Sequence, residues 1–411
     1  GVWMLWLPFI VSLAFFFGAL IWWFAIAKRV HYARNQIELR VFVTGSRGKS
    51  GTVRLVHAIL SNNGIPTYAK VTGTIAEEIT TAGAVVETRR MGTISANEMI
   101  DVFERAGSDG AKAAVMECMA VAPKLISFVQ NKVVQAPIVV IPTIRLDHLE
   151  DEGDTIPGIT KAIVTGLERV QTLVTGETNE EAQHVMRTWA KRQHATMIEA
   201  VASPADPVIP GHHPTNVAVA IATAGALGIE RTYALSGLER VSLEPDAETS
   251  WEMHLQGIDI TLTDVGGAND PQSGGEAAAR AMAEADGNAF VPIIVNRWDR
   301  PLRALAFANA LKPDPRISKV GVIGTAVPQT LRALRRAGFQ RNQIVRLGSW
   351  NTIPRTRALH TLRSLVSPRI TGEVVMFENI HSFSADKIRE AAHESGQAVG
   401  PDTSSQKGGA Q

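Results

Sequence analysis

The most distinctive hydrophobic pattern in the chain is an uninterrupted apolar segment at its N-terminus. Residues Val2 to Ala27 contain no charged side chain and consist mainly of aliphatic and aromatic residues. As a helix this segment would be about 39 Å long, enough to cross a hydrocarbon core of about 30 Å with some tilt. We therefore expect a transmembrane anchor over residues 1–27, followed by a basic connector over residues 28–36.

Aromatic and basic residues at the ends of this segment predict its orientation. Tryptophans stand near both ends, where their rings prefer the two membrane interfaces. Basic side chains follow the segment and none precedes it, so the positive-inside bias places the short N-terminus outside and the long C-terminal part in the cytoplasm of a single-pass protein of the cell membrane. A cleaved signal peptide is the competing interpretation, but the basic n-region and a clear A-x-A site are missing. The residues concerned are Trp3, Trp6, Trp22, Trp23, Lys28, Arg29, Arg34 and Arg40.

Beyond the connector, the pattern alternates between short β-branched runs and segments with helical spacing. Ile37 to Thr44 reads as a strand, Gly45 to Ser50 as a glycine loop, and Thr52 to Leu60 as a helix that Asn63-Gly64 closes. The alternation recurs and predicts a largely parallel sheet covered by helices, an α/β central domain over residues 37–243. The further strand candidates are Ala113–Glu117, Ile138–Ile141 and Thr172–Val174.

A second α/β domain is expected over residues 244–394. Leu243-Glu-Pro-Asp246 interrupts a helical region between Ser236 and Glu252 and marks the boundary. Five strands would make a compact Rossmann-like fold, and residues 395–411 lack apolar periodicity and predict a disordered tail. The strand candidates are Ile258–Asp264, Phe290–Val295, Lys319–Ile323, Gln343–Leu347 and Glu373–Phe377. The helix candidates are Glu276–Ala285, Leu302–Leu311 and Thr330–Ala337.

Composition narrows the function only modestly. The 411 residues are 45% hydrophobic and carry a formal charge of +1, so nothing draws the chain as a whole toward nucleic acid. A single cysteine, Cys118, excludes an internal disulfide framework and is typical of a reducing compartment. No internal repeat is present. These observations leave a globular, membrane-anchored protein with cytosolic domains.

The glycine loop carries the most specific chemistry. Glycines let backbone N–H groups approach phosphates, Lys49 neutralises phosphate charge, and the hydroxyl of Ser50 can bind Mg²⁺. The usual P-loop has a glycine where this chain has Val43, so the spacing departs from the standard form. ATP is the expected ligand. The predicted nucleotide contacts in this loop are Gly45, Ser46, Arg47, Gly48, Lys49, Ser50, Gly51 and Thr52.

Two further strand ends carry candidate metal ligands. Glu117 ends an apolar strand, and open α/β sheets bind ligands at that edge. The segment after Ile138–Ile141 contains Asp147-His148, which predicts a second metal position. A paired surface carboxylate and a surface loop with one titrating histidine are the alternatives. Cys118 is interpreted as a packed thiol.

These motifs, in this order, resemble the Mur ligases. That family has a glycine loop of the form G-T-x-G-K-[ST], a strand-end metal glutamate and a later D-H motif. It also has a G-x-H-N-x-x-N segment that contacts the nucleotide, which Gly211 to Asn216 resembles, except that His213 replaces the usual asparagine. The resemblance implies nucleotide contacts by His212 and Asn216. Helix capping is the alternative role of these residues.

Within the superfamily the chain is similar to the poly-gamma-glutamate synthases of the PgsB or CapB group, from about Ile37 to Ser382. Asp264-Val-Gly-Gly267 departs from the more apolar stretch expected there. The resemblance rests on Glu117-Cys-Met-Ala-Val121, Arg145-Leu-Asp-His148, Ala268-Asn-Asp-Pro271, Asn296-Arg-Trp-Asp-Arg300 with Arg303, and Asn379-Ile-His381.

The resemblance implies amide formation through an acyl phosphate, with release of ADP and phosphate. Lys49 would neutralise charge, and the predicted Mg²⁺ ligands are Ser50, Thr72, Glu117 and His148, with Thr74 a further candidate. Arginines of the second domain would bind acidic groups, although surface salt bridging is their alternative role. These arginines are Arg297, Arg300 and Arg303, and the tentative nucleotide contacts there are Asp264 and Asn269.

The implied substrates are glutamate and the growing poly-gamma-glutamate chain, and the implied partners are small integral-membrane subunits and the lipid bilayer, with no nucleic acid. Three alternatives stay open. The first is another Mur-type ligase that acts on folates or peptidoglycan precursors, which the apolar segment disfavours. The second is a membrane-anchored assembly or transport ATPase, whose ATP hydrolysis would be indifferent to glutamate. The third is a scaffold with a degenerate nucleotide site.

Overall fold

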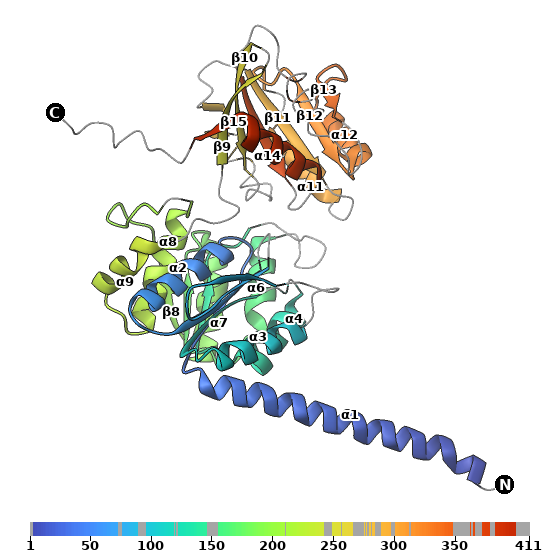
Figure 1. The fold of residues 1–411 in the computed structure, drawn as a ribbon, viewed down its shortest axis with the longest axis vertical. Helices are drawn as coiled ribbons and strands as arrows, with labels where there is room; N and C mark the ends of the chain where they lie inside the picture. Colours follow the sequence, from blue (N-terminus) through green and yellow to red (C-terminus); the bar gives the residue numbers. More distant parts are fainter. Residues whose placement is uncertain are drawn as a thin grey trace. The chain divides into compact units, whose positions relative to one another are not determined.

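A computed structural model describes most of the chain in two compact units. The first comprises residues 1–144, 148–209 and 213–242, and the second comprises 145–147, 210–212 and 243–411. Each unit is described by itself (Figure 1). The described residues are 3–72, 76–88, 96–118, 120, 122–145, 155–209, 211–241, 249–255, 257–265, 275, 277, 279–280, 282–283, 289–296, 301–311, 314–347, 362, 365, 372–378 and 383–399.

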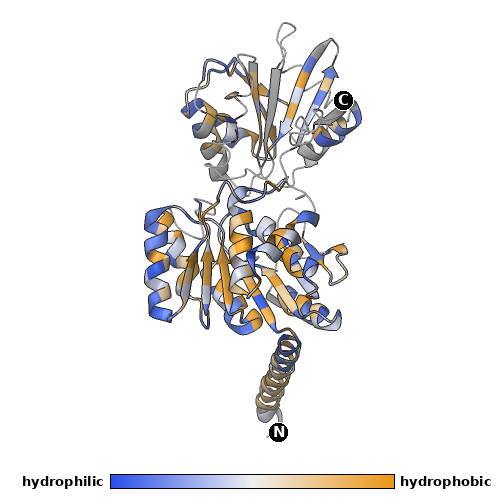
Figure 2. Cartoon of the chain, turned by 90° about the vertical axis from the view of Figure 1, so that its left-hand side faces the viewer, coloured by the Kyte–Doolittle hydropathy of each residue, from blue (hydrophilic) through white to orange (hydrophobic). Residues whose placement is uncertain are grey.

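The N-terminal segment forms one long helix, α1 (Trp3–Gln36). The basic residues expected to form a connector continue this helix. Its stretch from Phe9 to Gln36 is long and apolar enough to cross a membrane by length and composition, and it is drawn mainly in hydrophobic colours (Figure 2). Only its last turns join the domain, where Val30 and Ala33 are buried.

The first unit contains an eight-stranded sheet in the order β4-β3-β2-β5-β1-β6-β7-β8. Strands β2, β5, β1, β6, β7 and β8 pair in parallel, while β3 and β4 pair antiparallel at one edge, which confirms a largely parallel sheet. The strands are β1 (Leu39–Val43), β2 (Thr67–Val71), β3 (Glu77–Ile79), β4 (Val85–Glu87), β5 (Ala113–Glu117), β6 (Ile138–Ile141), β7 (Thr172–Thr175) and β8 (Thr196–Glu199).

Helices cover both faces of this sheet. Because side chains alternate along a strand, Phe42 joins one core cluster with α1, α3, α6 and α7, whereas Val41 and Val43 join another with α2, α8 and α9. The helices are α2 (Lys49–Asn62), α3 (Ala96–Ser108), α4 (Pro123–Phe128), the π-helix η1 (Val129–Val134), α6 (Ile156–Thr165), α7 (Glu180–Gln193), α8 (Pro214–Ala226), α9 (Arg231–Gly237) and the 3₁₀-helix η2 (Leu238–Arg240).

The second unit contains a seven-stranded sheet in the order β13-β12-β11-β14-β10-β9-β15. Strands β10 to β14 of this sheet correspond to the five predicted ones. The strands are β9 (Thr249–Leu255), β10 (Ile258–Asp264), β11 (Ala289–Asn296), β12 (Val320–Gly324), β13 (Ile344–Arg346), β14 (Gly372–Glu378) and β15 (Gly396–Val399). The helices are α11 (Pro301–Leu311), α12 (Val327–Arg336) and α14 (Phe383–Ser395), and the described residues between 275 and 283 are also helical.

Two strands of this sheet were not expected. Strand β9 pairs antiparallel with β10 and buries Trp251 and Met253, although its residues follow the predicted boundary directly. Strand β15 pairs antiparallel with β9 and lies in the segment 395–411 that was predicted to be a disordered tail. Ser395 ends α14, so that prediction was wrong for residues 395–399. These residues lack an apolar pattern because pairing with β9 through the backbone defines the strand.

Candidate active site

The glycine loop connects the carboxyl end of β1 to the start of α2. Gly45 and Gly48 have φ angles of +119° and +81°, which side chains of L-residues rarely adopt. A Cβ atom on Gly48 would lie 2.3 Å from Oδ1 of Asn216, and one on Gly45 would lie 3.1 Å from the carbonyl oxygen of Thr143. Both conformation and close packing therefore require glycine at these two positions.

The start of α2 is built to receive an anion. Its N-cap residue is Gly48, which provides no side-chain cap, and its first turn contains no acidic residue. The first N–H groups of a helix have no partner within the helix, and they carry the positive end of its dipole. Within the described part of the chain, the buried hydroxyls of Ser46 and Thr52 also have no hydrogen-bond partner. These polar groups suit phosphate oxygens.

Lys49 folds back over the loop that precedes it. Its ammonium group donates hydrogen bonds to the carbonyl oxygens of Gly45, at 2.7 Å, and Ser46, at 3.3 Å. Backbone carbonyls hold the charge in place without neutralising it. The cation therefore remains available to an anionic ligand at the loop.

The carboxylate of Glu117 lies beside the hydroxyl of Ser50. Ser50 Oγ donates to Glu117 Oε2 at 2.9 Å, and the backbone N–H of Thr72 donates to the same oxygen at 2.8 Å. Glu117 is only 2% exposed. A hydroxyl and a carboxylate in contact at a phosphate-binding loop are the oxygen ligands that Mg²⁺ prefers. Thr72 thus contacts this group through its backbone, whereas its hydroxyl was the predicted ligand.

Ser50 and Glu117 are the predicted metal ligands whose side chains meet in the described part of the chain. Among the described residues no group of three His, Cys, Asp or Glu side chains gathers to hold a metal. Asp147, His148 and Thr74 lie outside the described residues, so the second metal position stays a prediction. Cys118 follows Glu117 and is buried, and burial raises the pKa of its thiol to about 12. It packs as an inert side chain, as expected.

The segment after β6 contacts the glycine loop and supports it. The sequence did not predict this contact. Thr143 forms an isolated antiparallel bridge with Arg47, and its hydroxyl donates to the Arg47 carbonyl oxygen at 3.2 Å. Glu177 is 2% exposed and accepts hydrogen bonds from the N–H groups of Ile144, Thr178 and Asn179. Its place two residues after β7 was the available signal. Glu177 thereby fixes the start of the segment that leads to Asp147 and His148.

The start of α8 brings one predicted nucleotide contact to the loop. The side chain of Asn216 lies against Gly48, as the close approach of its Oδ1 shows. His213 instead caps α8, because its Nδ1 accepts a hydrogen bond from the N–H of Thr215. His212 is 8% exposed. Capping therefore accounts for the residue that departs from the family pattern.

The predicted residues of the second unit remain largely untested. Asp264 ends β10, is buried, and accepts a hydrogen bond from Arg389 of α14, so it has a structural partner within its own unit. The side chains of the other candidates lie outside the described residues. These candidates are Asn269, Arg297, Arg300 and Arg303, together with Ala268–Pro271 and Asn379–His381.

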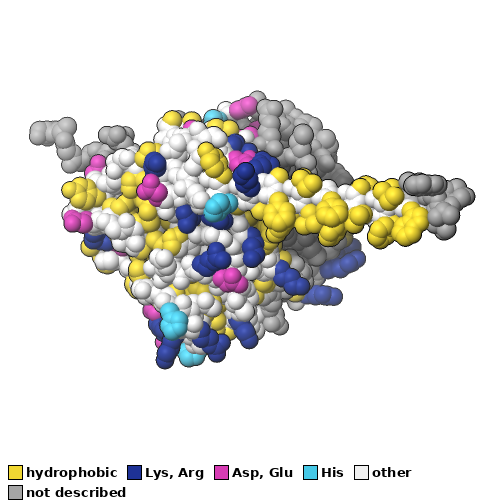
Figure 3. Space-filling view, turned by 90° about the horizontal axis from the view of Figure 1, so that it is seen from below, with side chains coloured by type: hydrophobic (Ala, Val, Ile, Leu, Met, Phe, Trp, Pro, Cys, Tyr) yellow, Lys and Arg dark blue, Asp and Glu magenta, His cyan; other side chains and the backbone are white. Residues whose placement is uncertain are grey.

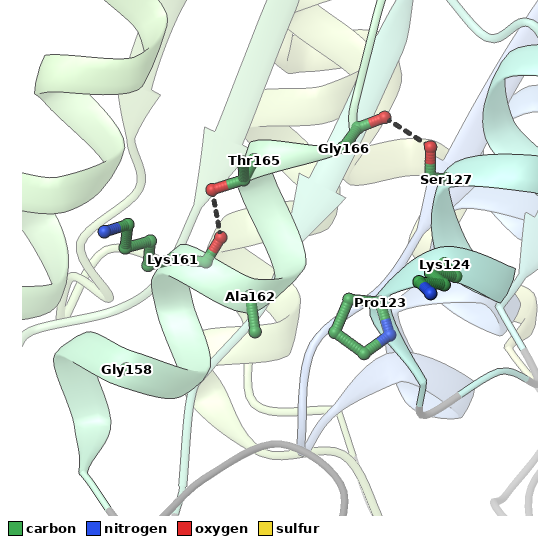
Figure 4. A pocket seen from close by; sticks show the side chains of 8 residues that line it. All are labelled: Pro123, Lys124, Ser127, Gly158, Lys161, Ala162, Thr165 and Gly166. Atoms are coloured by element: carbon green, nitrogen blue, oxygen red, sulfur yellow. Dashed lines mark hydrogen bonds between the residues drawn. The ribbon is translucent and has the colours of Figure 1, made fainter.

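A separate pocket of about 500 Å³ lies between α4 and α6. Figure 4 shows Pro123 and Ala162 facing each other across it, with Ser127 bonded to the carbonyl of Gly166. It shares no lining residue with the glycine loop. Its full lining is Pro123, Lys124, Ser127, Gly158, Lys161, Ala162, Thr165 and Gly166.

The glycine loop with Lys49, the strand-end carboxylate and the parallel sheet define an ATP-dependent amide ligase of the Mur type. Residues 43–221 match the Mur ligase middle domain, and residues 252–395 match the poly-gamma-glutamate synthase CapB C-terminal domain. The first unit thus matches a Mur ligase middle domain, and the second matches a CapB-type C-terminal domain.

Two relatives are similar to the chain over most of its length. The PGA synthase CapB of Bacillus subtilis (strain 168) is 27% identical over 380 residues, covering 90% of this chain and 94% of the relative. The capsule biosynthesis protein CapB of Bacillus anthracis is 27% identical over 336 residues, covering 79% and 72%.

Solved structures share the fold. A Mycobacterium tuberculosis folylpolyglutamate synthase complexed with ADP and AMPPCP has a TM-score of 0.62 at 16% identity, covering 90% of this chain and 96% of that one. MurF from Acinetobacter baumannii has a TM-score of 0.62 at 14% identity, covering 90% and 80%.

Proposed function

We propose that this enzyme joins glutamate into poly-gamma-glutamate and activates a γ-carboxylate as an acyl phosphate. One combination of observations carries the proposal. The glycine loop, Lys49 and the Ser50–Glu117 pair support phosphoryl transfer, and the CapB-type C-terminal unit favours the polymer among Mur-type reactions.

The first step transfers the γ-phosphoryl group of ATP. An oxygen of the γ-carboxylate attacks the γ-phosphorus, the bond from that phosphorus to the β–γ bridging oxygen breaks, and ADP leaves with the electron pair. Two anions must approach each other for this transfer, so positive charge has to surround them. Lys49 and the N–H groups at the start of α2 provide it. The hydroxyls of Ser46 and Thr52 are available to orient phosphate oxygens.

The second step forms the amide. The amine nitrogen of an incoming glutamate attacks the carbonyl carbon, the carbon–oxygen bond to phosphate breaks, and the amine loses its proton. Phosphate leaves readily, whereas the free carboxylate would have to expel oxide. The products are the amide, ADP and phosphate. Arg297 and Arg300 of the second unit are proposed to bind the acidic groups of substrate or nucleotide, since guanidinium pairs with carboxylate and phosphate.

Mg²⁺ is the proposed metal. Ser50 and Glu117 would hold it, and Thr72, through the N–H bond to Glu117 Oε2, orients the carboxylate. When bound, the ion would neutralise phosphate charge and act as a Lewis acid. His148 is the proposed ligand of a second ion.

Helix α1 is the proposed anchor of the enzyme in the cell membrane, with both units in the cytoplasm. Apart from its last turns the helix makes no core with the domain, and its large apolar side chains are exposed, including Phe15 at 78% and Ile21 at 70%. Small integral-membrane subunits are proposed as partners, because the charged product must cross a bilayer that disfavours charge.

The test is amide formation by the membrane-embedded enzyme, coexpressed with its neighbouring membrane genes and supplied with Mg-ATP and isotope-labelled glutamate. We expect labelled γ-linked polymer with about one ADP per amide, as the two steps require. AMP as the nucleotide product would reject the acyl-phosphate route. ADP release that is independent of glutamate and yields no polymer would instead identify an assembly or transport ATPase.

A further inference from the structure

The edge of the first sheet opposite the glycine loop carries many basic side chains. The glycine loop follows the carboxyl end of β1, whereas α1 leads into the amino end of the same strand, so the two lie at opposite edges of the sheet. Parallel strands place their amino ends together. Lys112 directly precedes β5, Arg169 precedes β7, and Arg192 lies in the last turn of α7, shortly before β8.

Four of these side chains form a group that we term the amino-edge cluster: Arg34, Arg40, Lys132 and Arg169. The Arg34 guanidinium donates to the carbonyl oxygens of Lys132, at 3.3 Å, and Val133, at 3.4 Å. Arg40 donates to the carbonyl oxygen of Gln135 at 3.3 Å. Arg40 and Arg169 lie within electrostatic range of Arg34, so like charges gather here.

Among the described residues, the arginines of this cluster have no carboxylate partner, whereas many other arginines do. Within the described part of the chain, no carboxylate lies within salt-bridge distance of Arg34, Arg40 or Arg169. The acidic groups near this edge are mostly engaged: Asp101 and Glu104 of α3 pair with Arg29 of α1, Glu38 pairs with Lys112, and Asp109 accepts hydrogen bonds from Thr81. Glu168 adjoins Arg169. The described arginines that pair with carboxylates include Arg29, Arg54, Arg105, Arg187, Arg231, Arg316 and Arg389.

Helix α1 holds this edge close to the apolar segment. Ile26 packs against the core of the unit, and Val30 and Ala33 are buried in it. Trp23 is exposed and lies three residues before Ile26, which corresponds to about 5 Å along a helix. The face seen from below shows Lys and Arg side chains spread around the base of α1, with fewer acidic ones among them (Figure 3).

We propose that the amino-edge cluster binds the anionic phospholipid headgroups of the leaflet into which α1 inserts. The proposal rests on the proposed anchor. It commits to lipid because the cluster is positively charged and continuous with the helix that would enter the bilayer. The first unit then rests on the membrane with its glycine loop at the edge facing the cytosol. Each basic side chain near an anionic membrane strengthens binding roughly fivefold, and salt weakens it.

The test measures how closely the domain approaches the lipid surface in the full chain. Gln193→Cys places a label at the exposed end of α7, at the same edge. Cys118 is buried with a raised pKa, so the new thiol is the reactive one. The labelled enzyme is reconstituted into nanodiscs of phosphatidylcholine alone or mixed with phosphatidylglycerol, and energy transfer to a headgroup acceptor is measured over a range of salt concentrations.

We expect energy transfer to rise with phosphatidylglycerol, to fall with salt, and to weaken in the variant Lys132→Gln with Arg169→Gln. This variant should favour the detached domain by roughly 25-fold, fivefold for each charge. The matched control, Lys124→Gln with Lys161→Gln, removes two exposed lysines beside the α4–α6 pocket and should behave as the unmodified enzyme.

Equal energy transfer with and without anionic lipid, or equal losses in the two variants, would overturn the proposal. Resistance of the full chain to alkaline extraction from membranes tests the anchor separately. An enzyme that stays in the membrane but ignores lipid charge contradicts only the amino-edge cluster. Release by alkali contradicts the anchor, and with it the lipid-binding proposal. Polymer formation tests the proposed reaction independently of both.

Discussion

Two groups of charged side chains lie within the first unit, and they differ in how completely the fold satisfies them. Lys70 of β2 is fully buried, with its ammonium 3.0 Å from Glu98 and 2.8 Å from the hydroxyl of Thr88. At the glycine loop, and within the described part of the chain, Lys49 donates hydrogen bonds to backbone carbonyl oxygens only. The buried Lys70, paired with a carboxylate, therefore has a structural role. Lys49, held by carbonyl oxygens near the hydroxyls of Ser46 and Thr52, is instead positioned to bind a ligand.

The group around Lys70 continues through Glu78. Its carboxylate accepts hydrogen bonds from Tyr68 at 2.6 Å, Thr88 at 2.9 Å and both Nε and Nη2 of Arg105 at 2.8 Å. These contacts join β2, β3 and α3. The charges of this network neutralise one another, and the network stabilises the strands beside Glu117. None of the residues named in it belongs to the glycine loop.

The largest expected effect is the loss of activity on removal of the Lys49 ammonium group. Lys49→Ala should reduce amide formation by at least about 10³-fold, because phosphate charge is then left uncompensated during transfer. Its thermal stability should change little, since only two hydrogen bonds to carbonyls are lost. Labelled polymer and a melting curve measure the two effects. Lys161→Ala, an exposed lysine of α6, is the control, and a stable Lys49→Ala enzyme with full activity would contradict the comparison.

Glu117→Gln should reduce activity by about 10²-fold or more and raise the concentration of divalent cation needed for half-maximal activity. The amide oxygen can still accept hydrogen bonds from Ser50 and Thr72, so the fold should persist. Titration of activity with Mg²⁺ measures the effect. An unchanged Mg²⁺ dependence would show that Glu117 is a structural carboxylate like Glu78.

Lys70→Met should destabilise the first unit by about 3–5 kcal/mol, because it leaves carboxylates buried without their cation. Activity for each folded molecule should fall less than about threefold. Denaturant unfolding and active-site-normalised rates separate these quantities. Lys112→Met, whose side chain is 59% exposed, should cost less than about 1 kcal/mol. A stable but inactive Lys70→Met enzyme would place Lys70 in the active site.

The smallest expected effect is on the stability of the first unit at acidic pH. Burial opposes ionisation of Glu78, but hydrogen bonds from Arg105 and Tyr68 outweigh it and lower the pKa below its ordinary value of 4.5. A lowered folded pKa contributes stability above pH 4.5 that is lost as pH falls through the folded value. The stability difference between the natural enzyme and Glu78→Gln should therefore be constant near neutrality and shrink below about pH 4.5. A difference that grows on acidification would reverse the sign.

The sequence predicted the strands that are apolar along almost their whole length. Ala113–Glu117 and Ile138–Ile141 match β5 and β6 end for end, because both are buried on two faces. Strand β2 was missed because Lys70 interrupts its apolar run. Its partner Glu98 stands 28 positions later, on α3, so the neutralisation that lets a lysine occupy a buried strand is a tertiary effect that local pattern does not contain.

The features of the candidate site likewise divide into those that local sequence predicts and those that depend on tertiary contacts. The glycine loop and Lys49 were predictable from local sequence, since their spacing and flanking elements carry the signal. The contact between Ser50 and Glu117 joins residues 67 positions apart and was anticipated only through the family resemblance. The backbone contact of Thr72 and the support from Thr143 and Glu177 were not anticipated, because they depend on which strands are neighbours and not on residue type.

The most direct test of the central claim follows an oxygen atom. Glutamate labelled with ¹⁸O in its γ-carboxylate is supplied with Mg-ATP to the membrane-embedded enzyme, and the released phosphate is examined by mass spectrometry. If this site activates the carboxylate as an acyl phosphate, one ¹⁸O passes into phosphate for each amide formed, and none does with Lys49→Ala. Polymer formation with unlabelled phosphate, or with ¹⁸O in AMP, would contradict the account.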